Sequence, residues 1–236
     1  MANAQLVPTT IEISDTAASL PIIDMSGLRS SNHAVRAKVG RQIGEACRDK
    51  GFFYVTGHEI SSDLQQRVID QAAKLFAMAP EEKAKVDKSL SQANRGYEPL
   101  RNQVLEAGAP ADVKEGFYIG QDKPLDHPDV LNGKFNQGPN LWPEALPEFR
   151  ATMEQYQWEL EAVAQLLMQG VALSLGLPEQ HFAGFCHDAM TTLRLLHYPP
   201  QSPSAAPGEK GCGAHTDWGG LTLLLQDDNS GLQVWD

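Results

Sequence analysis

The chain has 236 residues, of which 42% are hydrophobic and 21% charged, proportions that are ordinary for one large globular domain or two small ones. Its formal net charge of −11 argues against a nucleic-acid-binding surface and against attraction to anionic membranes. Residues 1–15 lack the features of a signal peptide, no apolar run reaches the ~20 residues of a membrane span, and the three cysteines form no disulfide framework, so a cytoplasmic protein is expected.

The first part of the chain alternates short strands with amphipathic helices. Strands are predicted over 20–24 and 52–55, which are rich in apolar, aromatic and β-branched residues and end at turn residues. Helices are predicted over about 32–49, 61–76 and 80–88, where apolar residues recur at helical spacing or Pro and Glu mark a first turn.

The second part of the chain begins with a long irregular stretch. Residues 90–146 are rich in Gly, Pro and Asn, and a stretch of this length usually carries function or wraps a site. A long scaffold helix is predicted over about 147–175, where Gly176 follows as a stop signal. Helices followed by short strands predict an α+β fold. The remaining predicted strands lie at 95–97, 114–119, 191–198, 221–225 and 232–235.

The segment Gly211–Gln226 holds a candidate metal site. His215 and Asp217 are separated by one residue, and side chains two apart on an extended strand point to the same face. An imidazole and a carboxylate on one face supply two of the three ligands in the 2-His-1-carboxylate site of non-haem Fe(II) proteins. A loop histidine bonded to a nearby aspartate is the simpler alternative. Cys212 could be a further ligand, although a small apolar filler is the commoner role of a free cysteine.

Other catalytic motifs are absent from the sequence. It contains no Walker A loop, no Gly-x-Ser-x-Gly elbow, no His-Glu-x-x-His and no Cys-x-x-Cys. Nucleophilic catalysis by Cys212 with His215 is disfavoured because no orienting acid is evident.

The sequence resembles the isopenicillin N synthase-like Fe(II)/2-oxoglutarate dioxygenases along nearly its whole length. The similar segments occur in the family's order, the first three in its N-terminal domain and the last three in its core: Leu20–Asp24, Gly51–His58, Lys114–Phe117, Leu193–Pro200, Gly213–Asp227 and Gly231–Val234.

This resemblance implies a double-stranded β-helix, or jelly roll, preceded by a mainly helical region. It divides the chain into an N-terminal dioxygenase region, 1–135, and a region 136–236 that holds the scaffold helix and the first half of the jelly roll. It implies that His215, Asp217 and a second, distant histidine bind Fe(II). Tyr198 matches the tyrosine that helps to hold the far carboxylate of 2-oxoglutarate, a contact that a phenolic hydroxyl can donate; otherwise it is a strand-end aromatic.

The activity implied is the hydroxylation, desaturation or cyclisation of a small organic substrate with Fe(II), 2-oxoglutarate and O₂. A variant of it is an oxidase that dispenses with 2-oxoglutarate. No residue is assigned as a catalytic acid or base. Four side chains are candidates for the substrate pocket from their position alone: Arg95, Tyr97, Phe117 and Trp218.

The sequence departs from the family pattern near its end. No histidine follows His215 and no arginine follows Lys210, so the family's second metal histidine and its Arg-x-Ser clamp for 2-oxoglutarate are missing. A jelly roll needs eight strands, and only about four are predicted. The simplest interpretation is a C-terminally truncated member with an incomplete jelly roll. The alternatives are that His187 or His197 is the third ligand, or that the chain is a non-catalytic remnant or binding module.

Overall fold

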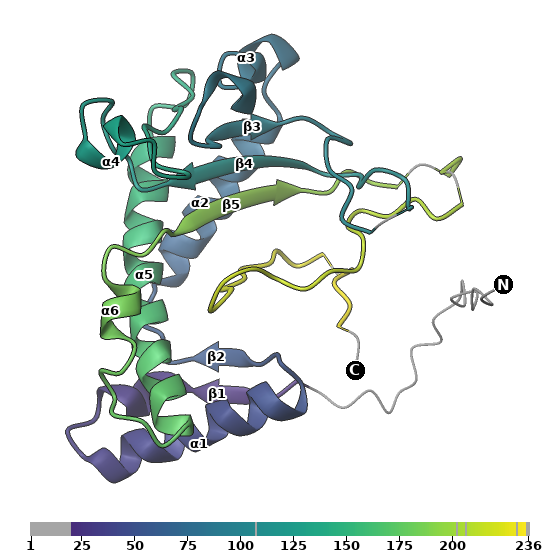
Figure 1. The fold of residues 1–236 in the computed structure, drawn as a ribbon. Coiled ribbons are helices and arrows are strands. Elements are labelled where there is room, and N and C mark those ends of the chain that lie inside the picture. Colours follow the sequence, from purple (N-terminus) through teal and green to yellow (C-terminus); the bar gives the residue numbers. More distant parts are fainter. Residues whose placement is uncertain (1–19, 107, 202, 206, 230, 235–236) are drawn as a thin grey trace, which may run out of the picture.

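The computed structural model describes residues 20–106, 108–201, 203–205, 207–229 and 231–234. In this part of the chain two small sheets are arranged along one long helix, α5 (Phe149–Ser174), as Figure 1 shows. The presence of helices and sheets confirms the predicted α+β class. The other elements are β1 (Ile22–Asp24), η1 (Met25–Arg29), α1 (His33–Asp49), β2 (Tyr54–Thr56), α2 (Ser62–Phe76), α3 (Pro80–Ala84), η2 (Lys88–Leu90), β3 (Gly96–Glu98), β4 (Glu115–Gly120), α4 (Pro128–Leu131), α6 (Ala183–Cys186) and β5 (Thr192–His197).

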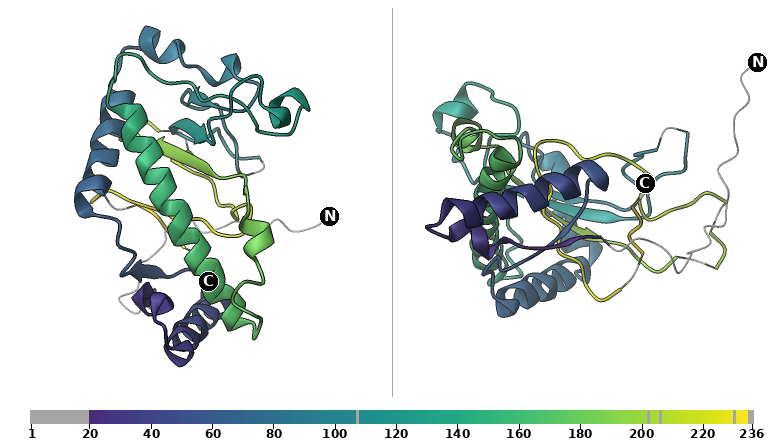
Figure 2. Two further views of the ribbon diagram at one scale, coloured as in Figure 1. Left: turned by 90° about the vertical axis from the view of Figure 1, so that its left-hand side faces the viewer. Right: turned by 90° about the horizontal axis from the view of Figure 1, so that it is seen from below.

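The first sheet and α1 lie at the C-terminal end of α5 (Figure 2). β1 and β2 pair in parallel. α1 approaches α5 closely because Gly40 and Gly44 face it. A Cβ atom added to Gly40 would lie 2.7 Å from Cβ of Leu173, and one added to Gly44 would lie 2.8 Å from Cβ of Ser174. The backbones of the two helices can therefore pack at a distance that any larger side chain would prevent.

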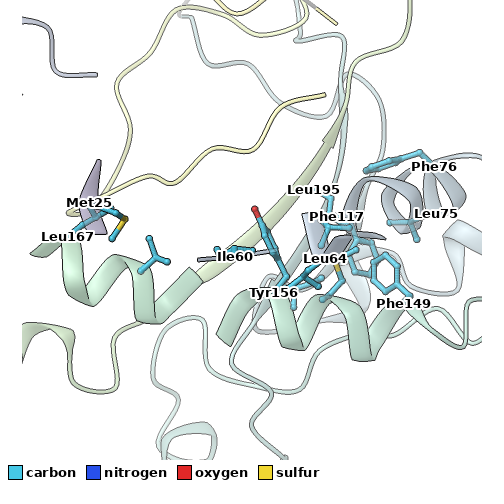
Figure 3. Close-up of a cluster of buried hydrophobic side chains, with 14 of the residues drawn as sticks. Met25, Ile60, Leu64, Leu75, Phe76, Phe117, Phe149, Tyr156, Leu167 and Leu195 are labelled. Carbon is cyan, nitrogen blue, oxygen red and sulfur yellow. The ribbon is translucent and has the colours of Figure 1, made fainter. Parts of the chain in front are cut away.

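The second sheet is antiparallel, with β4 between β3 and β5. β4 is almost wholly buried, and Phe117 on it pairs with Leu195 on β5. The ring of Phe117 packs edge-on against Phe149 of α5, with the ring centroids 5.4 Å apart. The core between this sheet, α2 and α5 also contains Leu64, Leu75, Phe76 and Tyr156 (Figure 3). Met153 belongs to the same core. No helix in the described part of the chain has the length and apolarity needed to cross a bilayer.

Most predicted elements form with shifts of one or two residues, but the helix predicted over 80–88 is wrong in its second half. α3 ends at Ala84, and a separate 3₁₀ turn follows. The carbonyl of Val86 accepts a hydrogen bond from the amide of Tyr97 at 2.7 Å, so this backbone pairs with β3 and cannot continue the helix.

The segment after Gly211 is extended but forms no regular strand. The sequence predicts a strand over 221–225 that is buried on both faces in a complete jelly roll, and this strand is not formed because no neighbouring strand pairs with it among the described residues. Leu224 is 62% exposed. The strand predicted over 232–235 is likewise absent over 231–234, and residue 235 lies outside the described residues. Alternate leucines, Leu221, Leu223 and Leu225, are partly buried and pack against the core. Figure 1 shows this end of the chain as extended backbone between the two sheets.

Candidate metal centre

His215 and Asp217 meet at the surface of the extended segment. Nε2 of His215 lies 3.4 Å from Oδ1 of Asp217, and the two side chains are 38% and 53% exposed. Two donor atoms bonded to a first-row metal ion at ~2.1 Å lie ~3 Å apart when they occupy neighbouring positions. The observed separation therefore fits two ligands of one ion, as the two-residue spacing predicts.

The imidazole of His215 is oriented by the backbone. Its Nδ1 lies 2.9 Å from the carbonyl oxygen of Gly213. A carbonyl oxygen can only accept, so this contact is a hydrogen bond when Nδ1 carries the proton, and in that tautomer the lone pair of a neutral imidazole lies on Nε2, which faces Asp217. Metal-binding histidines usually have their second ring nitrogen fixed in this manner.

Residues 112–114 hold the start of the same segment. Oδ1 of Asp112 accepts a hydrogen bond from the amide of Gly213 at 2.9 Å, and Nζ of Lys114 lies 3.1 Å from Sγ of Cys212. The amide of Val113 donates to the carbonyl of Lys210 at 2.9 Å. Asp112 was not predicted from the sequence, because its partner Gly213 lies 101 positions further along the chain.

Tyr198 follows β5 and lies beside the same segment. A Cβ atom added to Gly211 would be 2.9 Å from Cδ1 of Tyr198, so the ring covers this glycine. Burial against the segment, together with the neighbouring Cys212, raises the pKa of Tyr198 to about 12. The phenol therefore stays protonated at neutral pH and can donate a hydrogen bond to a carboxylate.

The described residues contain no third ligand next to the pair. No three His, Cys, Asp or Glu side chains gather among them in a group that could hold a metal ion. His187 is exposed at the end of α6. His197 belongs to a different cluster: its Nδ1 lies 2.8 Å from Oε1 of Glu115, and its ring stacks on Phe76 with the centroids 5.4 Å apart.

Glu115 is the centre of that buried cluster. It is 4% exposed and accepts hydrogen bonds from the hydroxyl of Tyr97, from Nζ of Lys83 at 2.9 Å and from His197. Burial alone would raise the pKa of Glu115, but these hydrogen bonds outweigh burial and hold the pKa below its usual range. The carboxylate is therefore charged and fully engaged by neighbouring side chains.

The prediction that four side chains line a substrate pocket is wrong for three of them. Tyr97 and Phe117 belong to the hydrophobic core, because β3 and β4 are buried on both faces. Arg95 is 2% exposed and donates to the carbonyls of Ala93 and Asn136, which makes it a structural residue. Trp218 alone is exposed, at 94%, and directly follows Asp217.

Comparisons with known proteins agree with this chemistry. Residues 20–145 match the family model of the N-terminal region of a non-haem dioxygenase in morphine synthesis. The chain is 44% identical over 220 residues to the 2-oxoglutarate-Fe(II) type oxidoreductase hxnY of Emericella nidulans, covering 92% of this chain and 63% of that protein. It is 42% identical over 225 residues to the 2-oxoglutarate-dependent dioxygenase citB of Monascus ruber, covering 92% of this chain and 68% of that protein.

Among solved structures, the fold is similar to that of a full-length Neurospora crassa protein crystallised in complex with alpha-KG. The TM-score is 0.72 at 27% sequence identity, over 88% of this chain and 64% of the Neurospora chain. The family model defines the class of the chain as the non-haem dioxygenases. With the family model and these relatives, the chain belongs to the Fe(II)/2-oxoglutarate-dependent dioxygenase family.

Proposed function

We propose that the protein is an Fe(II)- and 2-oxoglutarate-dependent oxygenase of a small organic substrate, with His215 and Asp217 as two of its metal ligands. The observation that carries the proposal is the 3.4 Å approach of Nε2 of His215 to Oδ1 of Asp217, with Nδ1 occupied by the Gly213 carbonyl. The relatives that support it are themselves named as 2-oxoglutarate-dependent enzymes.

Each site residue has a definite task in this proposal. His215 offers a neutral imidazole and Asp217 a carboxylate, which leave the other metal positions free for the remaining ligands. Tyr198, protonated because its pKa is about 12, donates to the far carboxylate of 2-oxoglutarate. Fe(II), when bound, supplies the activation of O₂ that is coupled to the oxidative decarboxylation of 2-oxoglutarate to succinate.

We further propose that residues 1–236 contain an incomplete jelly roll, divided into regions 1–135 and 136–236. The chain spans 63% of the length of the hxnY relative, and the exposed face of Leu224 is apolar surface that a further strand would cover. The antiparallel sheet contains strands of both regions, since β4 from region 1–135 pairs with β5 from region 136–236.

The same incompleteness sets the expected behaviour of this chain alone. Two ligands leave an iron ion largely hydrated, and Tyr198 alone cannot replace the bidentate contact of an arginine with a carboxylate. We therefore expect weak Fe(II) binding and little or no turnover of 2-oxoglutarate. The non-catalytic alternative would give the same weak turnover, but the names of the relatives do not favour it.

An anaerobic titration tests the proposal. Fe(II) is added to the wild type, His215→Ala and Asp217→Ala with and without 2-oxoglutarate. Binding is followed by tryptophan fluorescence and by the visible charge-transfer band, and then by succinate after O₂ is admitted. Weak binding in the wild type and none in either variant is expected. Equal binding by all three proteins would contradict the assignment of the two ligands. A tight complex with turnover would show that the chain holds a third ligand, and His187 and His197 would be mutated first.

A further inference from the structure

An ion pair without a role in the proposed reaction is buried beside the metal centre. Nζ of Lys114 lies 2.7 Å from Oδ2 of Asp112, and the two side chains are only 2% and 3% exposed. Removing two charges from water is unfavourable, and a buried pair of this kind often contributes little net stability. Its position must therefore be explained by what else the two side chains contact.

Both partners of this ion pair reach across to the segment that precedes His215. Asp112 uses its second oxygen, Oδ1, to accept the amide proton of Gly213 at 2.9 Å, while Lys114 contacts Sγ of Cys212 at 3.1 Å. The ion pair fixes the Asp112 carboxylate, so the oxygen that meets Gly213 has little freedom to rotate.

Gly213 transmits this restraint to the metal ligand. Its amide is bonded to Asp112, and its carbonyl accepts the Nδ1 proton of His215 at 2.9 Å. The residue is also confined on its third side, because a Cβ atom added here would lie 2.8 Å from Cβ and 3.0 Å from the amide nitrogen of Glu106. These contacts restrict the orientation of Gly213, and its carbonyl is the nearer of two groups that face Nδ1 of His215, the other being Sγ of Cys212 at 3.8 Å.

We propose that Asp112, held by Lys114, is a positioning residue for the metal centre: it fixes Gly213, and through Gly213 it fixes the tautomer and direction of His215. The proposal rests on the function proposed above. Its physical basis is preorganisation, since residues that orient a metal ligand set its affinity although they do not touch the ion.

Asp112→Ala and Asp112→Asn form a matched pair of variants. Asp112→Ala removes the acceptor for Gly213, and we expect Fe(II) to bind ~10–100-fold more weakly. Asp112→Asn keeps one oxygen for the same amide but leaves Lys114 without its counterion, so it should recover only part of the affinity. Arg101→Gln is the control, because it removes an ion pair between a half-exposed arginine and Glu209 that joins the same two chain segments outside residues 211–217; its affinity should equal that of the wild type.

Two measurements on the metal-free protein test the positioning itself. Amide hydrogen exchange at Gly213 should be slow in the wild type and faster in Asp112→Ala. Long-range ¹⁵N–¹H spectra should show His215 as the Nδ1–H tautomer in the wild type and as a mixture in Asp112→Ala. If Asp112→Ala does not fold, Gly213→Ala replaces it. This variant keeps the buried ion pair, but its added methyl group displaces the segment from Glu106. The same mixture of His215 tautomers is then expected.

The outcomes separate this inference from the proposed function. Unchanged exchange and tautomer in Asp112→Ala, or an Nε2–H tautomer in the wild type, would overturn the positioning role. Unchanged Fe(II) affinity in a folded Asp112→Ala protein would overturn it as well. If the wild type binds no Fe(II), the proposed metal centre fails, and the exchange and tautomer measurements still decide whether Asp112 orients His215.

Discussion

His197 and His215 each face a carboxylate, Glu115 at 2.8 Å and Asp217 at 3.4 Å, but their surroundings differ. Glu115 also accepts from Lys83 and Tyr97, and the ring of His197 is stacked on Phe76. Asp217, by contrast, is half exposed. In the first pair the oxygens of a buried carboxylate are engaged by several neighbouring side chains, whereas in the second the carboxylate of Asp217 is 53% exposed.

A histidine beside a carboxylate therefore does not by itself define a metal site. The chemical groups are the same in both places, and the difference is whether the protein has already supplied their partners. A pair whose carboxylate is buried and already bonded contributes to the scaffold, while a pair whose carboxylate is exposed can bind a ligand. Substitutions should therefore separate stability from metal binding.

The largest expected effect is on stability, from Glu115→Gln. Removing the charge leaves Lys83 buried without its counterion, and breaking a buried pair on one side typically costs about 3–5 kcal/mol. Urea denaturation should show this loss. The matched control is Glu82→Gln, which removes an exposed pair with Lys85 and should change the free energy of unfolding by less than about 0.5 kcal/mol. Equal losses would mean that the Glu115 cluster is not part of the scaffold.

Acidification should weaken the same cluster. The pKa of Glu115 is held below its usual 4.5 in the folded state, so the unfolded chain takes up the proton first as the pH falls. The contribution of Glu115 is therefore complete above this range and is lost as the pH falls through the lowered folded-state pKa. Urea denaturation at a series of pH values below 5 should show a steeper loss in the wild type than in Glu115→Gln. Parallel curves for the two proteins would contradict this.

The two histidines should respond in opposite ways to the same substitution. His197→Ala should reduce the free energy of unfolding by about 1–2 kcal/mol, since it loses a hydrogen bond to a charged group and a ring contact, and should leave Fe(II) affinity unchanged. His215→Ala should abolish Fe(II) binding and change stability by less than about 0.5 kcal/mol. Calorimetric metal titrations and urea denaturation of both variants measure these effects. A loss of Fe(II) binding in His197→Ala would mean that His197 also contributes to the metal site.

The smallest expected effect concerns the extended segment. Leu223→Ala should cost about 1–2 kcal/mol, below the range for a fully buried leucine, because Leu223 is partly buried against the core. Leu224→Ala, the same change one residue later, should cost less than about 0.5 kcal/mol because Leu224 is exposed. A similar loss in both variants, measured by urea denaturation, would show that a partner covers the second face in solution.

The elements that were predicted correctly carry their signals locally. Helix α1 begins after Asn32, whose side chain caps the amide of Ala34, and its apolar spacing is visible in the sequence. The run 221–225 has the composition of a strand, but a strand also needs a neighbour with free backbone groups, and composition does not reveal whether one is present.

In the candidate site, too, only the features with a local sequence signal could be predicted. His215 and Asp217 were found because their spacing of two is a local rule, and the structure brings them together. Tyr97 and Phe117 were misassigned because whether a strand residue faces a pocket or the core depends on what packs on each side of the sheet. Asp112 was missed because its partner, Gly213, is 101 positions away in the sequence.

That separation has a consequence for how the molecule reaches its final form. The His215–Asp217 pair spans three residues and can form in a short peptide, whereas the bond between Asp112 and Gly213 closes a loop of about a hundred residues. Contacts of such long range tend to form late in folding. The two ligand groups should therefore be close together early in folding, whereas their alignment by Asp112 should form last. Iron that binds to a nascent chain would bind first to a flexible chelate and only later to a fixed site.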